Sequence, residues 1–100
     1  MPQVRFFFEE RAFNADGTLA KPVRNCINKI GHDLHTKVPE FHRVSFDSRL
    51  ARICDALGLV QPVVPQSMVI CKQPGIGGEV RPHVDGAFLY TRPQSVLGFW

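Results

Sequence analysis

The chain opens on a segment in which two sets of side chains alternate. Between residues 3 and 9, one set is Val4, Phe6 and Phe8, and the other is Gln3, Arg5 and Phe7. A repeat of two residues is typical of a β-strand, because successive side chains point to opposite faces of a sheet. The segment Asn14-Ala15-Asp16-Gly17 follows, and Asp-Gly supplies the positive φ angle that tight turns need. We therefore predict a strand over residues 3–9 that leads into a short edge hairpin.

A helical spacing comes next. From residue 23 to residue 34 the apolar positions are Val23, Cys26, Ile27, Ile30 and Leu34. Intervals of three and four residues place these side chains on one face of a helix. Gly31 weakens the pattern, because glycine destabilises a helix interior. The spacing nevertheless predicts a helix over residues 23–34.

Two further helices are predicted between residues 38 and 58. The spacing of Val38, Phe41 and Val44 indicates a short helical piece. The strongest helical pattern runs from Ser48 to Leu57, with an apolar stripe made by Leu50, Ile53, Cys54 and Leu57. Asp47 or Ser48 can cap the start of this helix, and Gly58 can close its end.

The remainder of the chain has extended character. Pro62 and Pro65 break any helix, and the β-rich run from Ser67 to Lys72 predicts a buried strand. Residues 74–78 form a predicted loop. Extended chain returns over residues 80–85, and Val96 to Trp100 predicts another apolar strand. The order of elements indicates an α+β fold. Because the sequence stops inside an apolar run, we expect a C-terminally truncated domain.

Composition narrows the class of protein. One hundred residues make at most one domain, and 44% hydrophobic with 21% charged residues is typical of a globular chain. The net charge of +3 comes from scattered cations, so no nucleic-acid surface is indicated. No apolar stretch approaches the roughly 18 residues of a membrane span, and no targeting signal is evident. The odd number of cysteines, three without CxxC spacing, favours reduced thiols and a cytoplasmic location.

The candidate chemistry lies in His83-Val84-Asp85. On an extended strand, residues two apart share a face and are roughly 6.6 Å apart along the chain. An imidazole and a carboxylate at that spacing can converge on one ion. Two imidazoles and one carboxylate bind one face of Fe(II) and leave the opposite face open for O2 and a co-substrate. Taken alone, the His-x-Asp motif fits a hydrogen-bonded His-Asp pair in a loop better than it fits a metal site.

The context of this motif resembles the phytanoyl-CoA dioxygenase family. The segment from Lys72 to Asp85, with Phe88-Leu89-Tyr90-Thr91 after it, closely resembles that family, and so do residues 5–9, 27–32 and 62–68. The resemblance implies a double-stranded β-helix (a cupin-like jelly roll) with N-terminal helices. Residues 1–100 would be the incomplete N-terminal part of one such domain. Val84 stands where the family commonly has glutamine, a change that bears on substrate-side hydrogen bonding and not on ligation.

The resemblance also implies a set of site residues. His83 and Asp85 would hold Fe(II), while Lys29, Met68 and Trp100 would line the pocket of the co-substrate 2-oxoglutarate. Lys29 could pair with a carboxylate, since 2-oxoglutarate is a dianion. From the sequence alone, Lys29 also fits a solvated surface lysine, and Met68 and Trp100 fit ordinary core residues. The reaction would consume O2 and a small-molecule substrate, with ascorbate as a possible further cofactor.

Two site residues that the resemblance implies lie beyond Trp100, namely a second metal histidine and an arginine for the co-substrate. We therefore keep an alternative, a non-catalytic truncated isoform that binds partners or sequesters metal. The other histidines give weaker indications of a metal site. His32 and His35 are three residues apart and could share a helix face, but no cysteine or third ligand accompanies them. The segment Gly75-Ile76-Gly77-Gly78 lacks the Lys-Ser/Thr ending of a phosphate-binding loop.

Overall fold

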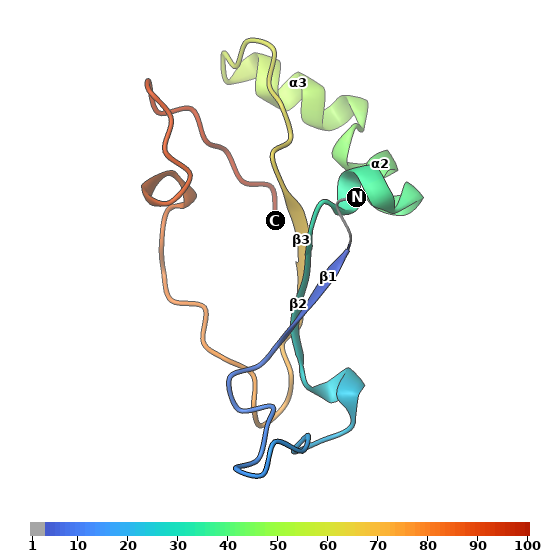
Figure 1. Ribbon diagram of the computed structural model, residues 1–100. Coiled ribbons are helices and arrows are strands. Elements are labelled where there is room, and N and C mark those ends of the chain that lie inside the picture. Colours follow the sequence, from blue (N-terminus) through green and yellow to red (C-terminus); the bar gives the residue numbers. More distant parts are fainter. Residues whose placement is uncertain (1–3) are drawn as a thin grey trace.

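The computed structural model describes residues 4–100 and builds them around one small antiparallel sheet (Figure 1). Its strands are β1 (Arg5–Phe8), β2 (Ile27–His32) and β3 (Ser67–Ile70), in the spatial order β1-β2-β3. Three α-helices, α1 (Leu34–Lys37), α2 (Pro39–Ser45) and α3 (Ser48–Ala56), lie between β2 and β3 in the sequence. The short 3₁₀ helices are η1 (Val23–Asn25) and η2 (Asp85–Ala87). The α+β prediction is confirmed, whereas the jelly roll stays a prediction, because residues 4–100 form only one three-stranded sheet.

The central strand corrects one prediction. Residues 23–34 are not a helix, because the 3₁₀ turn η1 ends at Asn25 and β2 starts at Ile27. In β2 the backbone pairs with β1 on one side and with β3 on the other. β-Branched residues such as Ile27 and Ile30 favour a strand that has neighbours to pack against. Pairing on both edges therefore outweighs the helical spacing of the apolar residues.

The register of the sheet places two predicted site residues on the same face. Lys29 lies opposite Phe7 of β1 and opposite Ile70 of β3. Met68 is two residues from Ile70 on β3, and residues two apart share a face. Met68 itself lies opposite Gly31, where a methyl group would come within 2.9 Å of the Met68 Cβ atom. The missing side chain at Gly31 thus makes room for Met68 beside Lys29.

The N-terminal hairpin and the two longer helices agree with the predicted elements. Thr18 O accepts a hydrogen bond from Asn14 N, and Gly17 adopts a φ of 84° in the turn between them. Helix α2 starts at Pro39, where a missing N–H costs nothing. Helix α3 is capped by Asp47, whose carboxylate accepts a hydrogen bond from Arg49 N at 2.8 Å. Gly58, with a φ of 76°, follows the end of α3.

The cap of α3 makes the helix sensitive to acid. The Arg49 side chain, which donates to both carboxylate oxygens, and the Arg49 backbone N–H lower the pKa of Asp47 to about 2 from 3.8. Because the folded pKa is depressed, the stabilisation is present above about pH 3.8 and is lost as the pH falls towards about 2. We expect far-UV circular dichroism to show α3 fraying in that interval. The Asp47→Asn variant should lack this component, and an identical acid response in both proteins would contradict the expectation.

Helix α1 is fastened to the sheet by Ser67 at the start of β3. Ser67 Oγ accepts a hydrogen bond from His35 N at 2.8 Å and lies 2.7 Å from the Nδ1 atom of the same histidine. His35 is only 5% exposed, and its Nε2 atom lies 3.6 Å from Asp33 Oδ1. This arrangement joins the helices to β3 directly before Met68.

Removing the Ser67 hydroxyl should loosen that connection. Ser67→Ala deprives a buried backbone N–H and a buried imidazole of their partner, which costs about 1–3 kcal/mol. We expect the midpoint of urea unfolding to fall accordingly. Ser95→Ala is the matched control, since Ser95 Oγ contacts only the exposed Thr91 hydroxyl, at 3.2 Å. Equal stability of the two variants would argue against the connection.

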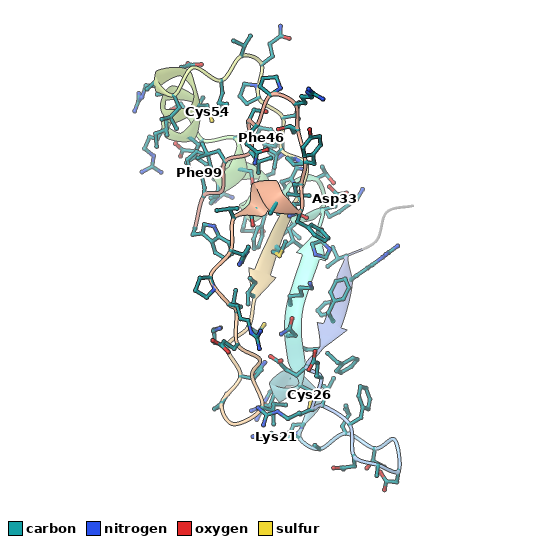
Figure 2. All side chains as sticks on the ribbon, turned by 90° about the vertical axis from the view of Figure 1, so that its left-hand side faces the viewer. Lys21, Cys26, Asp33, Phe46, Cys54 and Phe99 are labelled. Atoms are coloured by element: carbon teal, nitrogen blue, oxygen red, sulfur yellow. The ribbon has the colours of Figure 1, made fainter. Side chains whose placement is uncertain are left out.

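The molecule is elongated and buries few large side chains. Its extents are 51 × 29 × 26 Å, and the buried apolar residues are Ala12, Cys26, Leu34 and Cys54. Figure 2 shows Cys26, near Lys21, at the opposite end of the sheet from Phe46 and Cys54. The three cysteines are free, as predicted, and Cys26 and Cys54 are buried. Within residues 4–100, no helix has the length and apolar character to cross a membrane.

The last part of the chain departs from the sequence prediction. Residues 79–100 run along one side of the sheet as an irregular segment (Figure 1). The strand predicted for Val96 to Trp100 is wrong, because this segment pairs with no other strand among residues 4–100. Residues 80–85, predicted as extended chain, belong to no strand of the described sheet either, although the backbone of Val84 is extended. A single extended segment without backbone partners is not stable as a strand.

Candidate metal centre

His83 is oriented by the backbone just before it. Its Nδ1 atom lies 2.8 Å from the carbonyl oxygen of Arg81. Because a carbonyl can only accept, Nδ1 carries the proton and donates it. In the neutral imidazole the lone pair is then on Nε2. This tautomer presents Nε2 as a metal donor, and a hydrogen bond from the other ring nitrogen is the usual companion of a metal-binding histidine.

Asp85 faces that lone pair. The residue opens η2, where its carbonyl oxygen accepts hydrogen bonds from Phe88 N at 3.0 Å and Leu89 N at 2.7 Å. This turn fixes the backbone, and the Oδ1 atom lies 3.2 Å from His83 Nε2. A carboxylate oxygen and an imidazole lone pair at that distance repel each other unless a positive charge lies between them. A proton on Nε2 or a metal ion can supply that charge.

The donor set fits a divalent transition metal. One imidazole nitrogen and one carboxylate oxygen are two of the three ligands in a two-histidine, one-carboxylate Fe(II) site. Within residues 4–100, no group of three or more His, Cys, Asp and Glu side chains could hold a metal ion. The described chain therefore supplies two converging donor atoms, fewer than the three protein ligands of such a site.

His83 and Asp85 line a groove of about 530 Å³. The other lining residues are Val84, Gly86, Gln94, Val96, Leu97, Gly98 and Trp100. Gly98 permits a close approach, because a methyl group there would lie 3.3 Å from Asp85 Oδ2 and 3.0 Å from Trp100 Nε1. The indole of Trp100 and the carboxylate of Asp85 thus both lie next to the position that a side chain at Gly98 would occupy.

Gln94 is a groove residue that the sequence did not point to. A Cβ atom on Gly86 would collide with the Gln94 amide, whose Nε2 atom occupies that space. The amide therefore packs on the buried backbone next to Asp85. A lone glutamine after proline carries no recognisable sequence signal, so only the fold reveals it.

The remaining predicted residues lie apart from the groove lining. The Lys29 ammonium lies over the Phe7 ring, 5.1 Å from its centre, and Met68 shares that face of the sheet. The structure thus brings together His83, Asp85 and Trp100 in one place and Lys29 with Met68 in another. Phe88 and Tyr90 are 91% and 75% exposed and do not line the groove.

His32 and His35 do not form a second metal site. His32 ends β2 and packs edge-on against Phe7, with ring centres 5.2 Å apart. His35 is in α1, where it contacts Ser67. The two imidazoles therefore belong to different elements, and the helix that would have aligned them is absent.

Comparison with known proteins identifies the family. The chain matches the family described as phytanoyl-CoA dioxygenase (PhyH) over residues 1–100. It is 50% identical over 98 residues to a phytanoyl-CoA dioxygenase of Arabidopsis thaliana and 50% identical over 99 residues to phytanoyl-CoA dioxygenase domain-containing protein 1 of Danio rerio. Each alignment covers 98% of this chain but only 35% and 34% of the relative. The chain thus spans about a third of the length of these relatives, and it belongs to the phytanoyl-CoA dioxygenase (PhyH) family.

Proposed function

We propose that this chain is the part of an Fe(II)- and 2-oxoglutarate-dependent dioxygenase that supplies the first two iron ligands, His83 and Asp85. The observation that carries the proposal is the pair of electron-rich atoms 3.2 Å apart, with His83 held in its metal-binding tautomer by Arg81. Bound Fe(II) would supply the centre at which O2 is reduced while 2-oxoglutarate is converted to succinate and CO2. Family membership supports dioxygenase chemistry.

Each residue of the chain has a defined task in this proposal. Asp85 balances the charge of the ion, and His83 donates its Nε2 lone pair. Trp100 forms the wall of the groove beside Asp85. Lys29, with Met68 next to it, pairs with a carboxylate of 2-oxoglutarate when that face of the sheet closes over the co-substrate, and the sheet is one part of a larger jelly roll. In the whole protein these groups would direct hydroxylation of a C–H bond in a small-molecule substrate.

The single tryptophan offers a direct test. Trp100 is the only tryptophan in the sequence, is 88% exposed and lines the groove beside Asp85. We expect Mn²⁺ to quench its fluorescence saturably, and 2-oxoglutarate to change the signal further only when the metal is present. The Trp100→Phe variant lacks the tryptophan signal and serves as the control. Metal binding by this variant can be measured by calorimetry. A co-substrate response that does not depend on metal would contradict the proposal.

A second candidate function rests on a different observation. With only two converging ligands in residues 4–100, the chain could bind a metal or a protein partner without turning over 2-oxoglutarate. Release of CO2 from 2-oxoglutarate labelled at its first carbon separates the two functions. Metal binding without CO2 release favours the non-catalytic chain, and stoichiometric turnover favours the dioxygenase. Its free cysteines support a proposed cytoplasmic location for either form.

A further inference from the structure

A buried carboxylate that does not line the groove joins the two halves of the proposed site. Glu9, directly after β1, is 3% exposed. Its Oε2 atom accepts two hydrogen bonds, from Asn28 Nδ2 at 3.1 Å and from the backbone N–H of Gly78 at 3.0 Å. Its Oε1 atom is buried and has no hydrogen-bond partner in the part of the chain that the structure describes. A buried carboxylate with one oxygen that lacks a hydrogen bond lowers the stability of the fold, so the presence of Glu9 at this position calls for an explanation.

The two donors belong to segments that carry different site residues. Asn28 directly precedes Lys29 on β2, and its carbonyl oxygen accepts the Cys71 N–H at 2.7 Å. Gly78 ends the loop that leads to the His83-Val84-Asp85 motif. One oxygen atom of Glu9 therefore holds the strand of Lys29 and the approach to His83 in a fixed relation.

Hydrogen bonds at Gln73 and Pro74 also hold the start of this loop in place. Gln73 Nε2 donates to the carbonyl oxygens of Arg24 and Ile27, both at 3.0 Å. Lys21 Nζ donates to the carbonyl oxygen of Pro74 at 3.0 Å. Beyond Gly78, the hydrogen bonds described for residues 79–100 stay within that segment. The Glu9–Gly78 bond is thus the last contact of this kind that ties the chain to the sheet before the metal motif.

We propose that Glu9 is a positioning residue, which sets the distance between Lys29 and the metal pair His83 and Asp85. This inference rests on the proposed function and adds a residue to it. Metal binding alone needs only His83 and Asp85, which lie two residues apart and are aligned by Arg81 and η2. Binding of 2-oxoglutarate needs the metal and the Lys29 ammonium at a fixed separation, because one dianion must reach both. Glu9 therefore acts on co-substrate affinity and leaves metal affinity intact.

The test compares Glu9→Ala and Glu9→Gln with Glu10→Ala, a matched control at the exposed neighbouring glutamate. The glutamine keeps an oxygen that can accept from Asn28 and Gly78, so it should behave like the parent chain. Calorimetry measures Mn²⁺ affinity and then 2-oxoglutarate affinity of the Mn²⁺-loaded chain. NMR measures hydrogen exchange of the Gly78 amide without metal. If Glu9→Ala does not fold, Asn28→Ala removes one of the two donors in its place.

We expect Glu9→Ala to speed exchange at Gly78 and to weaken 2-oxoglutarate binding by about tenfold or more, with Mn²⁺ affinity little changed. Glu9→Gln and Glu10→Ala should resemble the parent chain. Equal loss of both affinities would indicate general destabilisation and overturn the proposal, as would unchanged 2-oxoglutarate binding. Failure of the parent chain to bind Mn²⁺ would defeat the proposed function. If the parent chain does not bind Mn²⁺ but Glu9→Ala speeds exchange at Gly78, Glu9 contributes only to folding. If exchange at Gly78 is also unchanged in Glu9→Ala, Glu9 does not hold Gly78 in place at all.

Discussion

Replacing His83 or Asp85 with alanine should lower the affinity of the chain for Mn²⁺ or Fe(II) by more than about 100-fold. Loss of a mere hydrogen-bond partner of a metal ligand already costs about 10–100-fold, and each substitution removes one of the two converging donors described within residues 4–100. Asp85→Asn should be nearly as damaging, because it removes the negative charge while keeping the shape. Anaerobic calorimetry with Fe(II), or the electron paramagnetic resonance signal of free Mn²⁺, measures the change.

The histidine control for this experiment is His42→Ala. The His42 Nδ1 atom contacts the carbonyl oxygen of His35 at 3.1 Å, its ring packs on Phe46, and the residue does not line the groove. Its loss should leave metal affinity unchanged. Metal binding that survives in His83→Ala and weakens in His42→Ala would place the ion elsewhere.

Gly77→Ala should be the most destabilising single-methyl addition to the loop before the metal motif. The new Cβ atom would lie 2.5 Å from the carbonyl oxygen and 3.1 Å from the nitrogen of Gln73, and both are backbone atoms. Relief requires moving the loop and stretching the Gly77 N to Gln73 O hydrogen bond, now 3.0 Å. Overpacking costs about 1–3 kcal/mol and the weakened bond about 1 kcal/mol more. Urea unfolding, followed by circular dichroism, should show the difference.

The matched control for this glycine is Gly58→Ala. Gly58 has a φ of 76°, and nothing lies within 4 Å of a Cβ atom placed there. Alanine at Gly58 should therefore cost only the backbone strain of the left-handed conformation, about 1–2 kcal/mol. Gly77→Ala should be less stable than Gly58→Ala and should also weaken the Gly78 contact with Glu9. Equal stability of Gly77→Ala and the parent chain would mean that the loop adapts without cost.

Helices α2 and α3 and the outer strands could be predicted because their signals are local. For α3, a capping aspartate, a four-residue apolar stripe and a terminal glycine all give the same answer, and the structure has the helix at Ser48–Ala56. The alternating side chains of β1 and the β-rich sequence of β3 likewise indicate a strand from residues within each segment. Such signals depend on side chains within one turn or one strand, so they do not depend on how distant parts of the chain fold.

The central strand could not be predicted in this way. The apolar residues Cys26, Ile27 and Ile30 satisfy a helical spacing, yet β2 is stabilised by partners more than 15 residues away in each direction. The spacing of apolar residues along the sequence does not reveal pairing with strands that are distant in the sequence. The reverse error occurred at Val96–Trp100, where an apolar run was assigned to a strand although residues 4–100 offer it no partner.

The proximity of His83 and Asp85 was predicted for a reason that differs from the one observed. The spacing of His83 and Asp85 was interpreted as two residues on one face of a strand. In the structure they converge because Arg81 orients the imidazole and η2 turns the carboxylate towards it. Neither contact has a signature in the sequence. Glu9 was also missed, because its partners Asn28 and Gly78 lie 19 and 69 residues away.

The order of the strands has a consequence for handling this protein in concentrated solution. Both β1 and β3 are outer strands, and no described strand covers their free edges. β1 carries the charged Arg5, which discourages a second molecule from pairing, whereas β3 reads Ser-Met-Val-Ile without any charge. We expect purified chain to self-associate through β3, edge to edge, as its concentration rises. A lysine in place of the exposed Val69 should act as a solubilising gatekeeper and delay the onset of light scattering.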